Sequence, residues 1–324
     1  MSNVSKSACT NSTSDGGPST FWIDLFTRDI ITCLGIIGNI LILVVLVQKC
    51  MRNTFNKLQV SLALSDTIML ITCLAAPVLK NFGAGILGEA YTFLLWPLRN
   101  FAMTTSVFLT VSIALERLLA VSDPLNYASN RRYGCRKYVS SAAIIAALLS
   151  IHLFFEIEPT LCNGMPGLFL GSVQTTAVSG GLIFTIYNTV ILKLLVTGLI
   201  PILMLISLYA AIYFKIKEHR SSTAQQHGNK MREEQKLAGI FAGVVLTSLI
   251  TITPDIVVKI ITLAQRMGLT MALGDNREAL FKVRDSILNS AINIFIYTFL
   301  GKEFRKCLWS ITRCSQIRFT HDCQ

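Results

Sequence analysis

Charged residues are scarce in this chain of 324 residues: Asp, Glu, Lys and Arg make up only 15%, against roughly 25% in ordinary soluble domains. Hydrophobic residues make up 52%, which is more apolar surface than soluble domains of this length could bury. They fall in blocks of about 20, the length that crosses ~30 Å of hydrocarbon as a helix. Inside lipid the backbone must satisfy its own hydrogen bonds, so each block is predicted to be a helix. The composition therefore excludes a soluble protein and predicts a membrane protein.

Catalytic constellations are lacking as well. The sequence contains neither H-E-x-x-H nor G-x-S-x-G, and His152 is the only histidine in an apolar block, where we interpret it as an interfacial side chain. Asp66 and Asp255 are predicted to lie in opposite halves of the membrane, too far apart to act as an acid–base pair. We therefore expect that the chain is not an enzyme. Internal repeats of the kind that transporters often carry are also lacking, which leaves a transporter or channel as the weaker alternative.

The apolar blocks predict seven membrane spans. They cover residues 24–48, 57–80, 92–120, 138–155, 186–214, 236–264 and 279–299. An eighth span over 168–187 is disfavoured, because the Gly, Ser and Thr residues of 171–181 suit a loop or hairpin. The predicted fold class is an all-α membrane protein, a seven-transmembrane helix bundle. We expect a disordered, glycosylated tail over 1–23, the bundle over 24–299, and a short amphipathic eighth helix with a cytoplasmic tail over 300–324.

Lys and Arg set the orientation, because they concentrate on the cytoplasmic side of membrane proteins. The first, third and fifth connections and the C-terminal tail hold most of the 29 basic residues, so we expect the N-terminus outside the cell and the protein in the plasma membrane. The N-terminal segment lacks the apolar core of a cleavable signal peptide. Its sequons predict glycosylation at Asn3 and Asn11. The net charge of +11 is then explained by contact with anionic inner-leaflet lipids and requires no nucleic acid.

Ionisable residues inside membrane spans are expensive, so each is a functional hypothesis. Asp66 lies in LALSDTIML, and Glu116 and Arg117 lie in SIALERLLAVSDPL. Further motifs follow one another along the predicted spans: Asn39 in GNILILVVL, Pro201 with Tyr209, Pro254, Asn293-Ile294-Phe295-Ile296-Tyr297, and then GKEFRKCL.

In this order, the motifs resemble those of the rhodopsin-like G-protein-coupled receptors over nearly the whole chain. The strings MRNTFNKLQVSLALSDTIML, SVFLTVSIALERLLAV and HLFFEIEPT are similar to those of invertebrate FMRFamide-type neuropeptide receptors. The resemblance implies a receptor that binds an extracellular peptide and activates a heterotrimeric G protein, with arrestin as a further partner. A small acidic ligand is the alternative.

The resemblance also implies a signalling switch at the cytoplasmic end of the third span. An unpaired buried Arg117 would be costly, and Glu116 beside it or Glu234 at the foot of the sixth span could hold it. We expect an Arg117–Glu234 pair to stabilise the resting state, and an agonist to favour an arrangement with the sixth helix swung outward. The predicted switch residues are Glu116, Arg117, Glu234, Tyr209, Asn293 and Tyr297.

Two further sites follow from the resemblance. Asp66, Ser106, Asn289 and Asn293 match a mid-membrane sodium pocket, and the alternative is a hydrated polar network without sodium. No other cofactor is expected. The ligand pocket would be lined by Arg99, Asn100, Met103, Lys193, Thr197, Asp255, Lys259, Val283 and Ser286.

The basic members of the pocket suit an acidic group on the ligand, whereas a cationic Arg-Phe-amide would contact Glu156, Glu158 or Asp255. An amine ligand is disfavoured, because Arg99 occupies the position where amine receptors have Asp. Residues 156–185 could form a hairpin lid.

Departures from the family pattern limit what the resemblance implies. The fourth span has no Trp, Ile252 replaces the usual aromatic residue of the sixth, and Ile294 replaces the usual Pro of the seventh, which leaves weak or lost G-protein coupling as an alternative. The usual Cys at the outer end of the third span is absent, and Cys9 could pair with Cys162 instead. Cys307 and Cys314 are candidates for palmitoylation, with inert thiols as the alternative.

Overall fold

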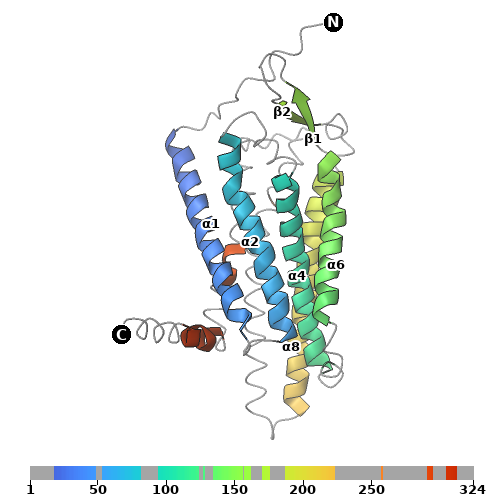
Figure 1. Ribbon diagram of the computed structural model, residues 1–324. Coiled ribbons are helices and arrows are strands. Elements are labelled where there is room, and N and C mark those ends of the chain that lie inside the picture. The colour runs from blue at the N-terminus through green and yellow to red at the C-terminus, as the bar shows by residue number, and fades with distance from the viewer. Residues whose placement is uncertain are drawn as a thin grey trace, which may run out of the picture.

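The helices of the protein run side by side as a bundle in the computed structural model (Figure 1). The structure describes residues 18–48, 53–81, 94–123, 127, 134–155, 157–161, 170–175, 187–222, 257, 290–294 and 304–311. Its elements are α1 (Pro18–Leu46), α2 (Thr54–Asn81), α4 (Trp96–Ser122), α6 (Gly134–Ser150), the 3₁₀ helix η3 (Ile151–Phe155), β1 (Ile157–Leu161), β2 (Leu170–Thr175), the π-helix η4 (Tyr187–Leu199) and α8 (Ile200–Ser222).

Within the described residues, five helical segments are long and apolar enough to cross a membrane. They correspond to the first five predicted spans, with ends that differ by a few residues. The first helix begins at Pro18 and not at residue 24, since proline fits the first turn of a helix, where its missing N–H removes no bond. Apart from 257 and 290–294, the sixth and seventh predicted spans lie outside the described residues.

The fifth span is built from two helical geometries. Residues Tyr187–Leu199 are wound as a π-helix, and α geometry begins at Ile200, next to the buried Pro201. A proline ring clashes with the carbonyl of the residue four positions earlier in an α-helix. The wider π turn before Pro201 relieves that clash, so the change of geometry falls at the proline.

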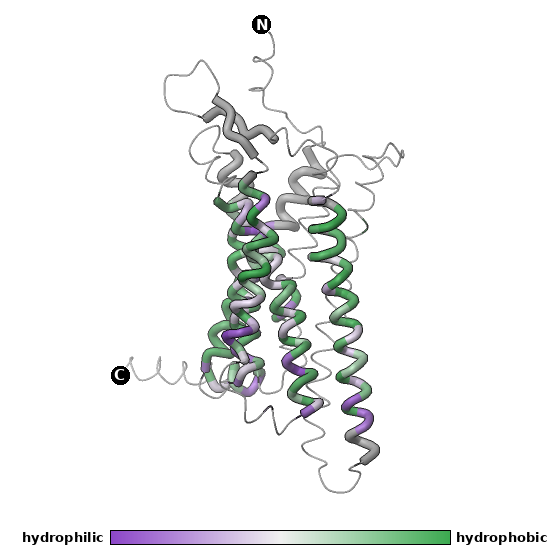
Figure 2. The backbone as a smooth tube through the Cα atoms, turned by 90° about the vertical axis from the view of Figure 1, so that its right-hand side faces the viewer, coloured by the Kyte–Doolittle hydropathy of each residue, from purple (hydrophilic) through white to green (hydrophobic). Residues whose placement is uncertain are grey.

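The central helix of the described bundle is α4, which packs against α2, α6 and α8. Leu58 of α2, Leu109 of α4 and Ala142 of α6 share one buried cluster. The outward faces are apolar too, and side chains such as Leu148 of α6 are 67% exposed. Figure 2 shows hydrophobic residues along most of the length of the coloured helices. A surface of this kind is stable against lipid tails and not against water.

Hydroxyl side chains inside the spans bond to their own helices. Thr67 Oγ1 donates to the carbonyl of Ala63 at 2.7 Å, and Ser207 Oγ donates to the carbonyl of Leu203 at 2.8 Å. Because lipid offers no partner for a hydroxyl, bonding to the preceding turn keeps these residues compatible with the membrane.

A β-hairpin follows α6 and η3 at one end of the bundle (Figure 1). β1 and β2 pair antiparallel, with Ile157 opposite Thr175 and an irregularity between Thr160 and Leu161. This confirms the predicted hairpin within 156–185. It lies beyond the ends of the spans, so the membrane part is all helical where the structure describes it.

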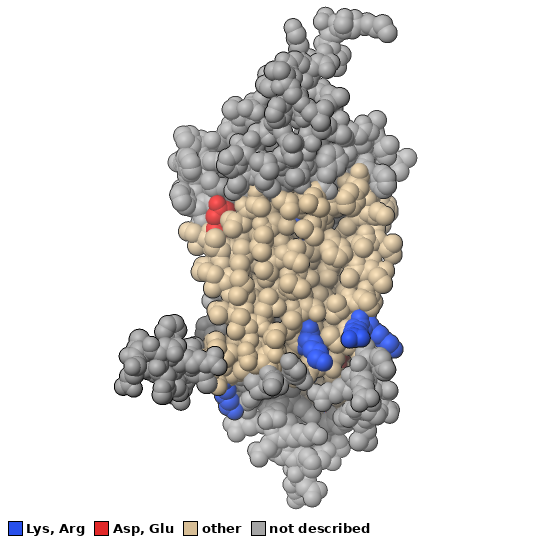
Figure 3. Space-filling model, viewed as in Figure 1, with Lys and Arg blue, Asp and Glu red and all other residues tan. Residues whose placement is uncertain are grey.

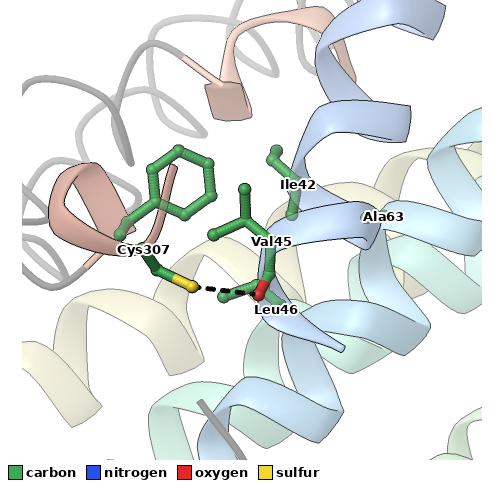
Figure 4. Close-up of a cluster of buried hydrophobic side chains, with 6 residues drawn as sticks. Ile42, Val45, Leu46, Ala63 and Cys307 are labelled. Atoms are coloured by element: carbon green, nitrogen blue, oxygen red, sulfur yellow. Dashed lines mark hydrogen bonds between the residues drawn. The ribbon is translucent and has the colours of Figure 1, made fainter. Parts of the chain in front are cut away.

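A short helix over 304–311 lies at the opposite end, where an eighth helix was predicted. Phe304 and Cys307 pack against Ile42, Val45 and Leu46 of α1, and the Cys307 Sγ donates to the carbonyl of Val45 at 3.9 Å (Figure 4). Cys307 is 8% exposed. The predicted palmitoylation of Cys307 conflicts with this packing, because an acyl chain on the thiol would have to displace α1.

Candidate functional site

Asp66 is the centre of a polar cluster in the middle of the bundle. It lies on α2 and is fully buried. Ser106 Oγ of α4 donates to Asp66 Oδ1 at 2.7 Å, Ser290 Oγ donates to the same oxygen at 2.9 Å, and Asn293 Nδ2 donates to Oδ2 at 2.7 Å. Three donors from two other segments therefore surround the carboxylate, which a buried charge needs in order to be tolerated.

Segment 290–294 is held in place by α1. Asn39 Nδ2 donates to the carbonyl of Gly35 at 2.9 Å and to the carbonyl of Ser290 at 2.9 Å. Gly35 and Gly38 lie so close to this segment that an added Cβ would be 2.8 Å from Ala291 Cβ and 2.7 Å from Ile294 Cγ2, respectively. The two glycines thus permit the close approach that brings Ser290 and Asn293 to Asp66.

Glu116 is the buried acid at the far end of α4 and is 1% exposed. Its Oε1 accepts a hydrogen bond from the Tyr127 phenol, and the Thr54 side chain bonds to Tyr127 in turn. Burial, followed by the hydrogen bond and negative charge of Glu116, raises the pKa of Tyr127 to about 12. The phenol therefore stays protonated, and remains a donor to Glu116, throughout the physiological pH range.

Arg117 lies on the aromatic ring of Phe55 at the start of α2. The guanidinium carbon is 3.3 Å from the ring centroid, and Phe55 is 7% exposed. A cation over an aromatic face contributes about 0.5–2 kcal/mol, more when water is excluded. This contact ties the Glu116 end of α4 to α2, and it is weak enough to be exchanged for another partner.

At the opposite end of α4, Arg99 lies above Trp96, with the guanidinium carbon 5.7 Å from the ring centroid. Asn100 Nδ2 donates to the carbonyl of Trp96 at 2.8 Å. Met103 packs against an apolar cluster that includes Met69 of α2. Of the predicted ligand residues, the structure thus places these three on α4 and a half-buried Thr197 on η4. The side chains of Lys193, Asp255, Lys259, Val283 and Ser286 lie outside the described residues.

The two polar centres of the bundle are the cluster around Asp66 and the end of α4 that carries Glu116 and Arg117. The protein family to which they belong follows from similarity to known proteins. Residues 38–297 match the family described as 7 transmembrane receptor (rhodopsin family). The chain belongs to this family. It is a multi-pass membrane receptor and not an enzyme.

Among the relatives of this receptor, the FMRFamide receptor of Drosophila melanogaster is 24% identical over 299 residues, which are 88% of this chain and 53% of the relative. A QRFP-like peptide receptor of Branchiostoma floridae is 26% identical over 92% of the chain and 79% of the relative. A pyroglutamylated RF-amide peptide receptor of Rattus norvegicus is 26% identical over 86% and 66%, respectively. The match thus spans about half the length of the Drosophila relative. The predicted likeness to FMRFamide-type receptors is confirmed.

Of the residues predicted for the sodium pocket, Ser106 and Asn293 donate hydrogen bonds to Asp66, and Asn39 lies nearby. Asn289 lies outside the described residues. Ser290 was not predicted, although it stands three residues before Asn293 and hence on the same helix face. Phe55 and Tyr127 were not predicted either, because no sequence pattern pairs an aromatic residue at a helix start or a loop tyrosine with Glu116 and Arg117.

The remaining switch residues are placed only in part. Tyr209 is half-buried and packs against a cluster of α4 and α8 that includes Ala114 and Ile212. Glu234 and Tyr297 lie outside the described residues, so the Arg117–Glu234 pair stays a prediction.

Modification sites and cysteines are placed in a similar way. Asn3, Asn11, Cys9, Cys162 and Cys314 lie outside the described residues. In the described part of the chain, Cys33, Cys73, Cys135 and Cys307 are not in disulfides.

The donor set around Asp66 suits a small hard cation. It offers a carboxylate, two hydroxyl oxygens and an amide, which are the oxygen ligands that such cations prefer. The hydroxyls of Ser106 and Ser290 donate to Asp66 and keep their oxygen lone pairs for a metal. Asn293 presents Nδ2 to Asp66, so it would have to turn its Oδ1 inward to coordinate. Asp66 is the only acidic residue of this cluster, and within the described chain no group of three or more His, Cys, Asp or Glu residues is placed to bind a metal.

Proposed function

We propose that this receptor binds an extracellular neuropeptide at the plasma membrane and activates a heterotrimeric G protein. The observation that carries the proposal is the buried Glu116 next to the half-buried Arg117, at the end of α4 that lies farthest from the β-hairpin. The relatives named above as FMRFamide and RF-amide receptors support a peptide ligand. Arrestin is a second expected partner of the same cytoplasmic surface.

The charge distribution supports this orientation. In Figure 3 the blue Lys and Arg side chains lie at the lower edge of a broad uncharged band. Basic residues that concentrate at one end of a membrane protein mark its cytoplasmic side. The described basic residues at this end, opposite the hairpin, include Lys57, Arg136, Lys137, Lys215, Lys217, Arg305 and Lys306. The hairpin and the start of α1 are then extracellular.

The cytoplasmic end of α4 has the properties of a switch. Glu116 is held by Tyr127 and Arg117 rests on Phe55. Losing the contact between Arg117 and Phe55 would cost about 0.5–2 kcal/mol, a range that overlaps the roughly 1–3 kcal/mol by which an allosteric ligand typically shifts an equilibrium. An agonist can therefore release Arg117 for contact with a G protein if it favours an arrangement in which α4 and its neighbours have moved apart.

Ligand recognition is proposed at the outer end of α4. Arg99 on Trp96 forms a cationic and aromatic surface that can bind an acidic group or the aromatic ring of a peptide. The strand β1 carries Glu158, which would pair with a basic peptide residue. A small acidic ligand is the second candidate, and the position of Arg99 favours it.

A sodium ion is proposed at Asp66, held by Asp66, Ser106, Ser290 and Asn293. When bound, it would neutralise the buried carboxylate and hold α2, α4 and segment 290–294 together. Without sodium, the direct hydrogen bonds of Ser106, Ser290 and Asn293 to Asp66 hold the same three segments together.

The test is a screen of amidated and acidic neuropeptides on cells that express the receptor, with calcium and cAMP readouts. At least one peptide is expected to give a response that Arg117→Leu removes at equal surface expression. Arg99→Gln should shift the dose–response curve without lowering the basal signal. Responses that persist in Arg117→Leu would overturn the proposed coupling route, and a response to acidic small molecules alone would favour the second candidate.

A further inference from the structure

Three sulfur-bearing side chains gather where α2 packs against α4, on the hairpin side of Asp66. Cys73 Sγ of α2 donates to Met69 Sδ at 3.8 Å, and both side chains are buried. Met103 of α4 is half-buried and packs against the same cluster. Met69 and Cys73 stand one and two helical turns after Asp66, and Met103 stands one turn before Ser106, the residue of α4 that bonds to Asp66. The three sulfurs therefore belong to the helix faces that meet.

The distance between the first two sulfurs suits a shared metal ion. Two sulfurs that bind one metal at about 2.3 Å, as in zinc–thiolate sites, are about 3.8–4.0 Å apart in tetrahedral or trigonal geometry. The 3.8 Å between Cys73 Sγ and Met69 Sδ lies in this range, so an ion can bridge them without a movement of α2. Methionine has three rotatable bonds and fills irregular gaps, which allows Met103 to bring its thioether to a third position on the ion.

We propose that Met69, Cys73 and Met103 form a binding site for a soft monovalent metal ion, Cu(I). Thiolate and thioether ligands select Cu(I), whereas hard cations prefer oxygen ligands. The charge of the site favours the same ion, because one thiolate neutralises Cu(I) and leaves no net charge in an apolar cluster. A divalent ion would leave one positive charge, and the nearby Asp66 already accepts hydrogen bonds from three donors.

Binding exchanges a proton for the metal ion. The Cys73 thiol loses its proton to water as the bond between sulfur and copper forms, because the thiolate is the metal ligand. The two thioethers donate lone pairs and lose nothing, and copper enters and stays as Cu(I), so no oxidant or reductant is needed. The bound ion joins α2 to α4 one turn outward of the Asp66 cluster. It is thus a second metal site, separate from the oxygen ligands around Asp66.

The test titrates the full receptor in nanodiscs with Cu(I), supplied without oxygen as its acetonitrile complex and buffered by a competing chelator. Unfolding is followed by tryptophan emission, which needs no thiol-reactive dye. At free Cu(I) about 100-fold above its Kd, the midpoint of the wild type should rise by about 5–10 °C. Zn(II) at the same free concentration should not raise it. Copper that stays bound after gel filtration gives the number of ions per receptor.

Two pairs of variants test the ligands against matched controls. Cys73→Ala should lose the rise in midpoint and one bound ion per receptor, whereas Cys33→Ala, which removes an exposed thiol of α1, should keep both. Met69→Leu/Met103→Leu nearly conserves volume and should weaken Cu(I) binding at least about ten-fold, since loss of an outer-shell partner alone costs about 10–100-fold. Met204→Leu, at a position that is 46% exposed on α8, should bind Cu(I) like the wild type.

Three outcomes would overturn the proposal. These are a Cu(I)-dependent rise that survives in Cys73→Ala, an equal rise with Zn(II), and unchanged Cu(I) affinity in Met69→Leu/Met103→Leu. Midpoints without metal show whether each variant is folded, and the methionine variant keeps the test decisive if Cys73→Ala is unstable. The titration uses neither a peptide nor a G protein. A failure here therefore leaves the proposed function standing.

Discussion

Replacing Gly38 by Ala should destabilise the receptor by wedging α1 away from segment 290–294. The new Cβ would lie 2.7 Å from Ile294 Cγ2 and 2.9 Å from Ile294 Cβ. Since Cβ is fixed to the backbone and β-branched side chains are stiff, Ile294 cannot turn aside. Forcing an extra carbon into a packed site typically costs about 1–3 kcal/mol.

The assay is thermal unfolding of the purified receptor, followed with a dye that becomes fluorescent on reacting with thiols. Cys73 is 3% exposed and Cys307 is 8% exposed, so both react only after unfolding. At roughly 2–4 °C per kcal/mol for a chain of this size class, a loss of about 1–3 kcal/mol means that Gly38→Ala should lower the midpoint by about 2–12 °C.

Gly134→Ala is the matched control. Its added Cβ would lie 3.7 Å from Thr54 Cγ2 and 3.8 Å from Tyr138 Cε2, which is ordinary contact. Since alanine favours a helix more than glycine does, its midpoint should stay the same or rise. A double-mutant cycle with Ile294→Ala should show a coupling of about 0.5–3 kcal/mol. Equal midpoints for the two glycine variants, or additive effects in the cycle, would refute the reasoning.

Further predictions concern the polar centres and the thiols. Tyr127→Phe should raise basal nucleotide exchange, because it leaves a buried Glu116 oxygen without its hydrogen-bond donor, which costs the resting state about 1–3 kcal/mol. Unchanged basal exchange would count against this. The pKa of Tyr127 lies at about 12, above its ordinary 10.0. The stability that the Tyr127–Glu116 bond contributes is therefore complete below pH 10 and is lost only as the pH approaches 12. The unfolding midpoints of the wild type and of Tyr127→Phe should thus differ by a constant amount between about pH 7 and 9. Asp66→Asn should remove any rise of the midpoint with sodium over choline, and a rise that persists would place the cation elsewhere. Acyl-exchange labelling, which reports palmitoylated cysteines, should be unchanged by Cys307→Ser and reduced by Cys314→Ser. A loss of labelling with Cys307→Ser would show that the Cys307 thiol leaves α1 to become acylated.

Hydropathy predicted the first five spans closely, because the thickness of the bilayer fixes the length of an apolar helix. The hairpin was also predictable, since the Gly-, Ser- and Thr-rich run after residue 170 suits neither a span nor a long helix. The π geometry of Tyr187–Leu199 was not, because no composition signal distinguishes a π-helix from an α-helix.

The polar centres were predictable only in part. Ser106 and Asn293 followed from the family motifs, whereas the Phe55–Arg117 contact depends on how α2 and α4 pack in three dimensions. The palmitoylation of Cys307 stays a prediction, but the packing favours the alternative of an inert thiol. Cys307 stands three residues after Phe304, and both side chains pack against α1.

The central claim is that the cytoplasmic end of α4 transmits a peptide signal to a G protein. Its most direct test is nucleotide exchange by a purified heterotrimeric G protein, with the receptor in nanodiscs and the amidated peptides added. An active peptide is expected to accelerate exchange for the wild type and for Lys215→Gln but not for Arg117→Leu. Peptide-stimulated exchange that is equal in the wild type and in Arg117→Leu would contradict it.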